Sequence, residues 1–384
     1  MKNFEANRIL KMKTSIFATM SQLAIKHKAV NLGQGFPDFD GPAWIMEEAY
    51  KAMKNGKNQY APMNGTLTFR KAISNVYKNY YSLDFNTDTE ITVTAGATEA
   101  LYSTFNAFFE EGDEVILFEP YYDGYYADLL LSGATPKFIT LHKPDFLFDF
   151  FELEAHITQK TKAIVLNNPH NPTGKVWTLE ELNLIAKLAK RYDLLVISDE
   201  VYEFLTFDNV QHIPFATLPE MKERTVTISS MGKTFGMTGW KIGYAVAPPN
   251  LTAAIQKIHQ WTAFAVNTPG QHSMAYALSQ LENYLPEFRK LYQNKRDFLF
   301  NELKTTKFKP HLPKGSYFIM VDIPAEKQID DIKCAMELVE KNGVATIPPS
   351  VFYSKSDEGK TMLRLCFAKK DEVLLAGIER LKEY

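Results

Sequence analysis

The sequence predicts an α/β fold, in which a mostly parallel sheet carries helices on both faces and a smaller α+β domain follows. Between about residues 91 and 247, short apolar runs bounded by turn residues alternate with helical patterns, which is typical of βα units. After about residue 305 the pattern changes to three apolar runs with two helical stretches, which favours a second, smaller domain.

The strands expected in the main sheet are short and apolar; they lie at residues 91–94, 114–118, 163–167, 194–198, 225–229 and 242–247. The helical patterns between them end near residue 110, cover 121–131 and return near 178–190. A mostly helical region then runs from about 249 to 305. In the smaller domain, strands are expected at residues 317–323, 343–348 and 362–368. Helices are expected near residues 329–341 and from the last strand to about 382. The first 30 or so residues contain no strand of the main sheet, and we expect them to pack against this C-terminal part.

Composition and charge narrow the class of protein. The 384 residues are 45% hydrophobic and 23% charged, as in soluble globular proteins with a large core. The net charge of −2 gives no electrostatic reason to expect nucleic acid or an anionic membrane as a partner. The N-terminus lacks the apolar core of a signal peptide, and no apolar run approaches the ~18–20 residues that span a bilayer. Cys334 and Cys366 are too few for a disulfide framework and lack metal-site spacing, so we expect a cytoplasmic protein without a metal.

Polar residues gather after the expected strands, at the carboxyl ends where open α/β sheets bind ligands. Residues 96–98 would begin a helix, whose free N–H groups favour an anion such as phosphate; a plain strand–helix turn is the alternative. Asn171 lies in the turn NNPHNPTG (167–174) and either presents its amide to a ligand or serves only the turn. Asp199 ends a strand, where a buried carboxylate needs a cationic partner unless it caps a helix. Tyr202 would offer its phenol to the same place.

The stretch SSMGKTFGMTGWKIGY (229–244) contains a lysine with unusual neighbours. Its letters GKT suggest a phosphate-binding P-loop, but that motif requires glycine at position 227, where this chain has Thr227. Met231 and Phe235 make a solvated surface position improbable for Lys233. Burial disfavours the charged form of a lysine, and a neutral amine can attack a carbonyl. The stretch therefore indicates Schiff-base chemistry.

A lysine for a Schiff base, a carboxylate for a pyridinium nitrogen and a phosphate cradle are together what pyridoxal phosphate (PLP) needs. The stretch 229–244, NPHNPTG and SDEVY, in this order and spacing, resemble the fold-type I, class I/II aminotransferases. Within that group the chain is similar to the kynurenine, glutamine and methionine aminotransferase branch, and looks most like the bacterial methionine aminotransferases. The segments that carry this resemblance are NLGQGFPDFDGP (31–42), QYAPMNGTLTFRKAI (59–73), AVNTPGQ (265–271) and TIPPSVFY (346–353).

The resemblance implies a large PLP-binding domain over residues 41–280 with a mostly parallel seven-stranded sheet. Residues 1–40 and 281–384 would form the small domain. It also implies that Lys233 holds the cofactor and moves the proton at the substrate Cα, and that Asp199 pairs with the pyridine nitrogen. The other cofactor contacts carried over are Asn171 and Tyr202 at the phenolate oxygen, Tyr122 stacked on the ring, and Ala97, Thr98, Ser230 and Lys241 at the phosphate.

On the substrate side, the resemblance implies that Arg364, in MLRLCFA (362–368), clamps the α-carboxylate together with Asn171 and the backbone near Gly35. Tyr60 corresponds to a tyrosine that reaches the phosphate of the neighbouring subunit, so a homodimer with shared active sites is expected. Phe17 stands where some kynurenine-using relatives have tryptophan. A side-chain pocket of Phe17, Tyr60, Val266 and either Tyr317 or Phe352 would suit methionine, glutamine or aromatic side chains.

These observations predict a ping-pong aminotransferase that moves the amino group of methionine, glutamine, an aromatic amino acid or kynurenine to a 2-oxo acid. A cysteine-conjugate β-lyase, or a kynurenine–oxoglutarate transaminase as the main role, are the alternatives within the same chemistry. A regulator that only senses PLP is a third. Family motifs begin by residue 31, which leaves no space for the DNA-binding domain that such regulators carry.

Overall fold

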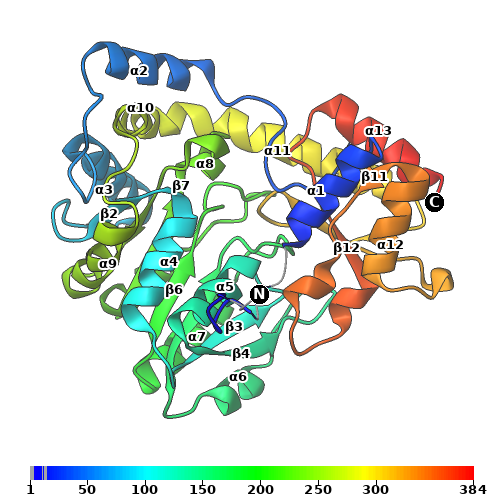
Figure 1. Cartoon of the computed structure of the whole chain (residues 1–384), viewed down its shortest axis with the longest axis horizontal. Coiled ribbons are helices and arrows are strands. Elements are labelled where there is room, and N and C mark those ends of the chain that lie inside the picture. The colour runs from blue at the N-terminus through cyan, green and yellow to red at the C-terminus, as the bar shows by residue number, and fades with distance from the viewer. Residues whose placement is uncertain (1–3, 11, 13–14) are drawn as a thin grey trace.

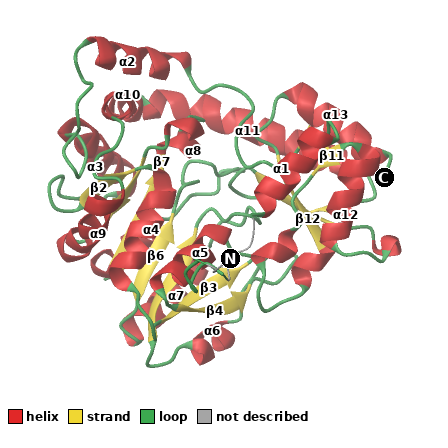
Figure 2. Cartoon of the chain, in the orientation of Figure 1, coloured by secondary structure: helices red, strands yellow, loops and turns green. Residues whose placement is uncertain are grey.

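The computed structural model of the chain describes residues 4–10, 12 and 15–384. Its largest element is a seven-stranded sheet with the strand order β2-β8-β7-β6-β5-β3-β4 (Figure 2). β8 is antiparallel to both of its neighbours, β2 and β7, and the other neighbouring strands are parallel to each other. The strands are β2 (Ile91–Thr94), β3 (Glu114–Glu119), β4 (Thr135–Thr140), β5 (Thr161–Asn167), β6 (Leu195–Asp199), β7 (Thr225–Ser230) and β8 (Gly243–Val246). The expected α/β sheet is confirmed.

Both faces of the sheet are buried, because successive side chains of a strand point to opposite faces. In β3, Val115 and Leu117 belong to one hydrophobic cluster, whereas Ile116 and Phe118 belong to another. The first cluster includes residues of α4 (Gly96–Phe108), α5 (Asp123–Ser132) and α9 (Pro249–Thr262). The second includes residues of α6 (Phe150–His156) and α7 (Leu179–Arg191). This two-sided burial explains the continuous apolar runs in the sequence.

The strand pattern in the sequence marked six strands of this sheet and overlooked β4. β4 pairs with β3 alone and forms an edge of the sheet. Its sequence, TPKFIT, begins with an exposed residue, and only Ile139 and Thr140 are buried. An edge strand needs no apolar run and tolerates proline, so neither signal of a buried strand is present. The resemblance had implied the seventh strand, and that number is confirmed.

Helices α2 (Ala43–Lys54), α3 (Leu67–Tyr81) and α10 (Thr268–Ser279) pack together at one end of the molecule (Figure 1). The short helix α8 (Met231–Thr234) begins directly after β7. The long helix α11 (Leu281–Leu303) follows α10 and leads to the C-terminal part of the chain. The mostly helical region expected between residues 249 and 305 is therefore confirmed.

The C-terminal part contains a three-stranded sheet of β9 (Lys309–Pro310), β10 (Phe318–Asp322) and β12 (Met362–Cys366). This part of the chain also contains two helices, α12 (Asp331–Glu337) and α13 (Asp371–Lys382). α12 continues as a π-helical stretch to Asn342. β1 (Val30–Asn31) pairs in parallel with β11 (Val344–Ala345), and α1 (Ile16–Lys26) contacts β11. The expected packing of the N-terminal segment against the tail is confirmed for these residues.

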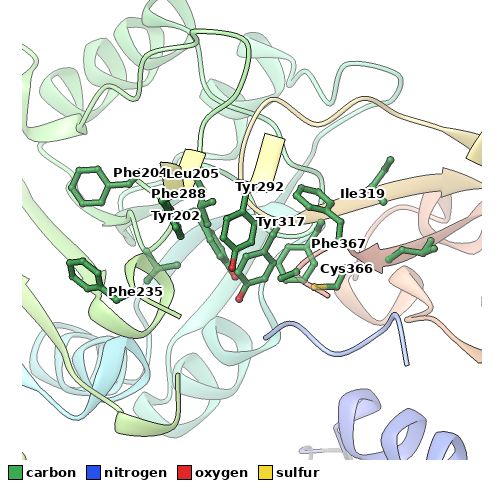
Figure 3. Close-up of a cluster of buried hydrophobic side chains, with 14 of the residues drawn as sticks. Tyr202, Phe204, Leu205, Phe235, Phe288, Tyr292, Tyr317, Ile319, Cys366 and Phe367 are labelled. Carbon is green, nitrogen blue, oxygen red and sulfur yellow. The ribbon is translucent and has the colours of Figure 1, made fainter. Parts of the chain in front are cut away.

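A cluster of buried aromatic rings joins the loop after β6 to α11 and β10 (Figure 3). The Tyr317 ring lies 5.1 Å from that of Tyr202 and 6.2 Å from that of Tyr292, centroid to centroid. Such pairs contribute about 0.5–1.5 kcal/mol each beyond the area that they bury. The cluster therefore fixes the C-terminal part against the edge of the large sheet that carries Asp199. Among the described residues, no helix is long and apolar enough to cross a membrane.

Candidate active site

A cavity of about 310 Å³ lies at the carboxyl ends of the parallel strands. Of the residues predicted to bind the cofactor or the substrate backbone, all except Tyr60 line it, whereas Val266, Tyr317 and Phe352 of the predicted side-chain pocket do not. They come from distant segments that the fold brings together: β6 ends at Asp199 and β7 ends at Ser230 in the large sheet, while Arg364 lies on β12 of the small one. Within the described part of the chain, no cluster of His, Cys, Asp or Glu is placed to hold a metal ion.

Lys233 lies in α8, one turn after β7 ends at the cavity. Its Nζ donates a hydrogen bond to Oη of Tyr317 (2.8 Å) and approaches the carbonyl oxygen of Gly35 (3.3 Å). Burial lowers the pKa of Lys233 to about 8, despite the nearby carboxyl group of Asp199. A substantial fraction of the amine is therefore neutral near physiological pH, as a nucleophile toward an aldehyde requires.

This pKa predicts how the apo-protein takes up PLP as pH changes. Below a pH of about 8 the amine of Lys233 is increasingly protonated and cannot attack the aldehyde. The second-order rate of uptake should thus rise about tenfold per pH unit on the acid side and level off above a pH of about 8. Stopped-flow absorbance of apo-protein mixed with PLP measures this profile. A rate that is flat from about pH 6 to about pH 9 contradicts a nucleophilic Lys233.

Asp199 ends β6 and is 4% exposed. Oη of Tyr125 donates to its Oδ2 at 2.6 Å, and the amide of Asn167 donates to its backbone carbonyl at 3.0 Å. Burial raises the pKa of Asp199 to about 6, and the hydrogen bond from Tyr125 opposes that rise. The carboxylate is thus mostly ionised at neutral pH and would be stabilised further by a positive charge placed before it. Tyr125 was missed from the sequence, although it lies one helical turn after Tyr122 in α5.

The opposite side of the cavity is built as an anion cradle. Helix α4 begins at Gly96, whose φ of +75° suits glycine, and its N-cap residue, Ala95, has no side-chain oxygen that could accept from the first N–H groups of the helix. Nζ of Lys241 donates to Oγ1 of Thr98 at 3.2 Å. Gly243 is required here, because a Cβ at that position would lie 2.8 Å from the backbone nitrogen of Ala97. Uncapped N–H groups and a lysine suit a phosphate.

Arg364 faces the cavity from β12 and is 1% exposed. Its Nη1 donates to Oδ1 of Asn171 (3.0 Å) and its Nη2 donates to the carbonyl oxygen of Gly33 (2.9 Å), while Nε is buried without a partner. Burial lowers the pKa of Arg364 to about 10, which still leaves it cationic at neutral pH. The rings of Phe17 and Phe318 lie 4.9 and 4.1 Å from its guanidinium carbon. The arrangement suits a small carboxylate.

Several residues of the predicted side-chain pocket lie elsewhere. Tyr60 is 83% exposed and contacts Phe264, away from the cavity of its own chain. Tyr317 donates its hydroxyl to the carbonyl oxygen of Gly35, and the ring of Phe352 contacts that of Phe17 at 5.8 Å; neither residue lines the cavity. The residues that line it but were missed from the sequence include Gln34, Phe36, Asn167, Thr238 and Phe318. Gln34 and Phe36 flank Gly35, which was predicted to bind the substrate, and this adjacency could have identified them.

The donor set fits PLP. A buried, partly neutral lysine would meet the aldehyde, a buried carboxylate would meet the ring nitrogen, and a helix start with a lysine beside it would meet the phosphate. The fold and the site therefore define a PLP-dependent enzyme of fold type I.

The comparison with known families agrees. The family model "Aminotransferase class I and II" matches residues 27–381, so the chain belongs to this family. It is an aminotransferase, and its cofactor is PLP.

Similar proteins cover the whole chain. A methionine aminotransferase of Escherichia coli (strain K12) is 42% identical over 98% of this chain and 97% of its own length. A kynurenine–oxoglutarate transaminase of Dictyostelium discoideum is 41% identical over 96% of this chain and 93% of its own. Among solved structures, an Escherichia coli protein with a methionine aminotransferase function has a TM-score of 0.96 at 40% identity, with each chain covered fully. The N-succinyldiaminopimelate aminotransferase of Mycobacterium tuberculosis has a TM-score of 0.96 at 38% identity, over 99% of each chain.

Proposed function

We propose that this aminotransferase takes its amino group from methionine or from an amino acid with a similar uncharged side chain, including glutamine, aromatic amino acids and kynurenine. The observation that carries the proposal is the cation content of the cavity. Its lining holds Lys233 and Lys241, which the cofactor would engage, and Arg364, which the α-carboxylate would engage. Among the lining residues that the structure describes, no further cation would pair with a side-chain carboxylate, while Phe17, Phe36 and Phe318 offer apolar surface. Aspartate is accordingly a poor donor.

The residues divide the reaction among them. When bound, PLP supplies a carbonyl that condenses with amines and a ring that withdraws electrons from the substrate Cα. Asp199 would keep a positive charge on the ring nitrogen, because its ionised carboxylate is buried and favours a cationic partner. Lys233, once released, would carry the proton from Cα as a general base, and its lowered pKa suits that role.

On the substrate side, Arg364 would hold the α-carboxylate and thereby orient Cα toward Lys233, with Asn171 fixing the guanidinium. Tyr122 would lie against the ring, and Asn171 and Tyr202 would donate to its phenolate oxygen. Ala97, Thr98, Ser230 and Lys241 would hold the phosphate through backbone and side-chain donors.

A donor panel tests the substrate. Purified enzyme with PLP and each of several 2-oxo acids is given methionine, glutamine, phenylalanine, kynurenine or aspartate, and the 2-oxo acid formed is quantified. We expect methionine or another uncharged donor to exceed aspartate in kcat/KM by about 100-fold, since a desolvated, unpaired carboxylate is strongly disfavoured. A preference for aspartate contradicts the proposal. Pyruvate and thiol release from a cysteine conjugate measures the β-lyase alternative separately.

We further propose a homodimer in which Tyr60 of one subunit reaches the phosphate of the other. In support, large apolar side chains are exposed near this segment: Trp261 (88%), Tyr60 (83%), Tyr276 (42%) and Phe264 (40%). They lie on or beside α9 and α10, at the end of the molecule that also carries α2 (Figure 1). Exposed patches of this kind mark association surfaces. We also propose a cytoplasmic location. The large domain is proposed to span residues 41–280, and residues 1–40 and 281–384 are proposed to form the small domain.

Sedimentation equilibrium tests the dimer, with a mass of twice 43.8 kDa expected. Tyr60→Phe should keep that mass but weaken PLP binding severalfold, because only the phenol is lost. A monomer that is fully active contradicts the shared site.

A further inference from the structure

Behind the phosphate cradle, outside the cavity lining, lies a buried pair of titratable residues. Glu99 of α4 is 9% exposed, and His259 of α9 is fully buried. Nδ1 of His259 lies 3.0 and 3.2 Å from the two carboxylate oxygens of Glu99, and its Nε2 lies 2.9 Å from the carbonyl oxygen of Met63. Neither residue was singled out from the sequence, and none of the functions proposed above uses them.

The partners of His259 define its charge. A carbonyl oxygen and an ionised carboxylate only accept hydrogen bonds, so both ring nitrogens must donate. The ring that satisfies both is the imidazolium cation. Burial alone lowers the pKa of His259, but the hydrogen bond and the charge of Glu99 outweigh it and leave the pKa raised. The two groups therefore form a buried ion pair between α4 and α9.

Glu99 in turn holds the start of α4. Its Oε2 accepts a hydrogen bond from the backbone N–H of Ala95 at 3.1 Å, and its Oε1 accepts one from Oγ of Ser103 at 2.6 Å. Ala95 directly precedes Gly96, where the helix and the cradle begin. The carboxylate thus fixes the turn that leads to Gly96, Ala97 and Thr98, which line the cavity. Glu99 also belongs to the first turn of α4, whose N–H groups would bind the phosphate, and His259 neutralises its negative charge.

We propose that protonated His259 is a positioning residue for the cofactor phosphate: through Glu99 it fixes the turn 95–98, and it cancels a carboxylate charge that would otherwise repel the phosphate. The inference rests on the proposed roles of Ala97 and Thr98. It concerns the phosphate alone and leaves the ring and the aldehyde of PLP to other residues. Loss of His259 should therefore discriminate between ligands with and without a phosphate.

The test compares the affinity of apo-protein for PLP and for pyridoxal, which lacks the phosphate, by absorbance titration. His259→Gln should weaken PLP binding about tenfold or more and leave pyridoxal binding within about twofold, since a charged hydrogen-bonded group is lost beside the phosphate only. Adding Glu99→Gln should restore most of the PLP affinity, because the unpaired carboxylate is removed. Should His259→Gln fail to fold, Glu99→Gln alone takes its place in the titration, because it preserves the size of both side chains.

His212→Gln provides the matched control. His212 pairs with the buried Glu200 (Nε2 to Oε2, 2.9 Å), which adjoins Asp199 rather than the cradle. Its loss should destabilise the fold similarly but should not change the ratio of PLP to pyridoxal affinity. An unchanged ratio in His259→Gln, or no recovery in the double variant, overturns the inference. Failure of the unsubstituted protein to bind PLP would instead overturn the proposed function.

Discussion

Lys233→Ala is expected to abolish transamination and to remove the visible absorbance band of the bound cofactor. In the proposed mechanism the substitution deletes both the amine that would attach PLP and the base that would move the Cα proton. General base catalysis alone contributes about 10²–10⁴-fold, and the loss of attachment adds to it. Steady-state kinetics and an absorbance spectrum of the purified variant measure the two effects.

Lys187→Ala is a suitable control for Lys233→Ala. Lys187 is an exposed lysine of α7 that does not line the cavity, so its removal should change neither the spectrum nor the rate. Full turnover by Lys233→Ala would refute the assignment of this lysine.

Arg364→Ala is expected to lower kcat/KM by about 100-fold for every amino acid donor, chiefly through KM, while PLP stays bound. A buried guanidinium binds a carboxylate with charge-assisted hydrogen bonds, and their loss costs about 2–3 kcal/mol. Arg364→Lys keeps the charge but not the planar fork of donors. Its kcat/KM should therefore lie between that of the unsubstituted enzyme and that of Arg364→Ala. Kinetics with an absorbance check of the cofactor measure both results. Loss of PLP from Arg364→Ala would exclude the substrate role.

The convergence of polar residues at the strand ends was predictable from the sequence, because the carboxyl ends of parallel strands meet at one edge. Asp199 and Ser230 each follow a recognisable apolar run, so their convergence follows from the sheet alone. Lys233 was recognisable from its apolar neighbours, and its lowered pKa agrees with burial.

The remaining features depend on contacts between segments that carry no mark of each other in the sequence. The pairs Tyr125–Asp199 and His259–Glu99 join residues 74 and 160 positions apart. The edge strand β4 has no buried run to reveal it. The side-chain pocket was the weakest prediction, because the orientation of Tyr317 toward Lys233 is set by tertiary packing.

The central claim is that Lys233 carries the cofactor. Borohydride reduction of the PLP-loaded protein, followed by proteolysis and peptide mass mapping, tests it most directly. We predict a phosphopyridoxyl group on the peptide that contains Lys233 and on no other. A label on Lys241 or another lysine, or no label on a protein that transaminates, would contradict this account.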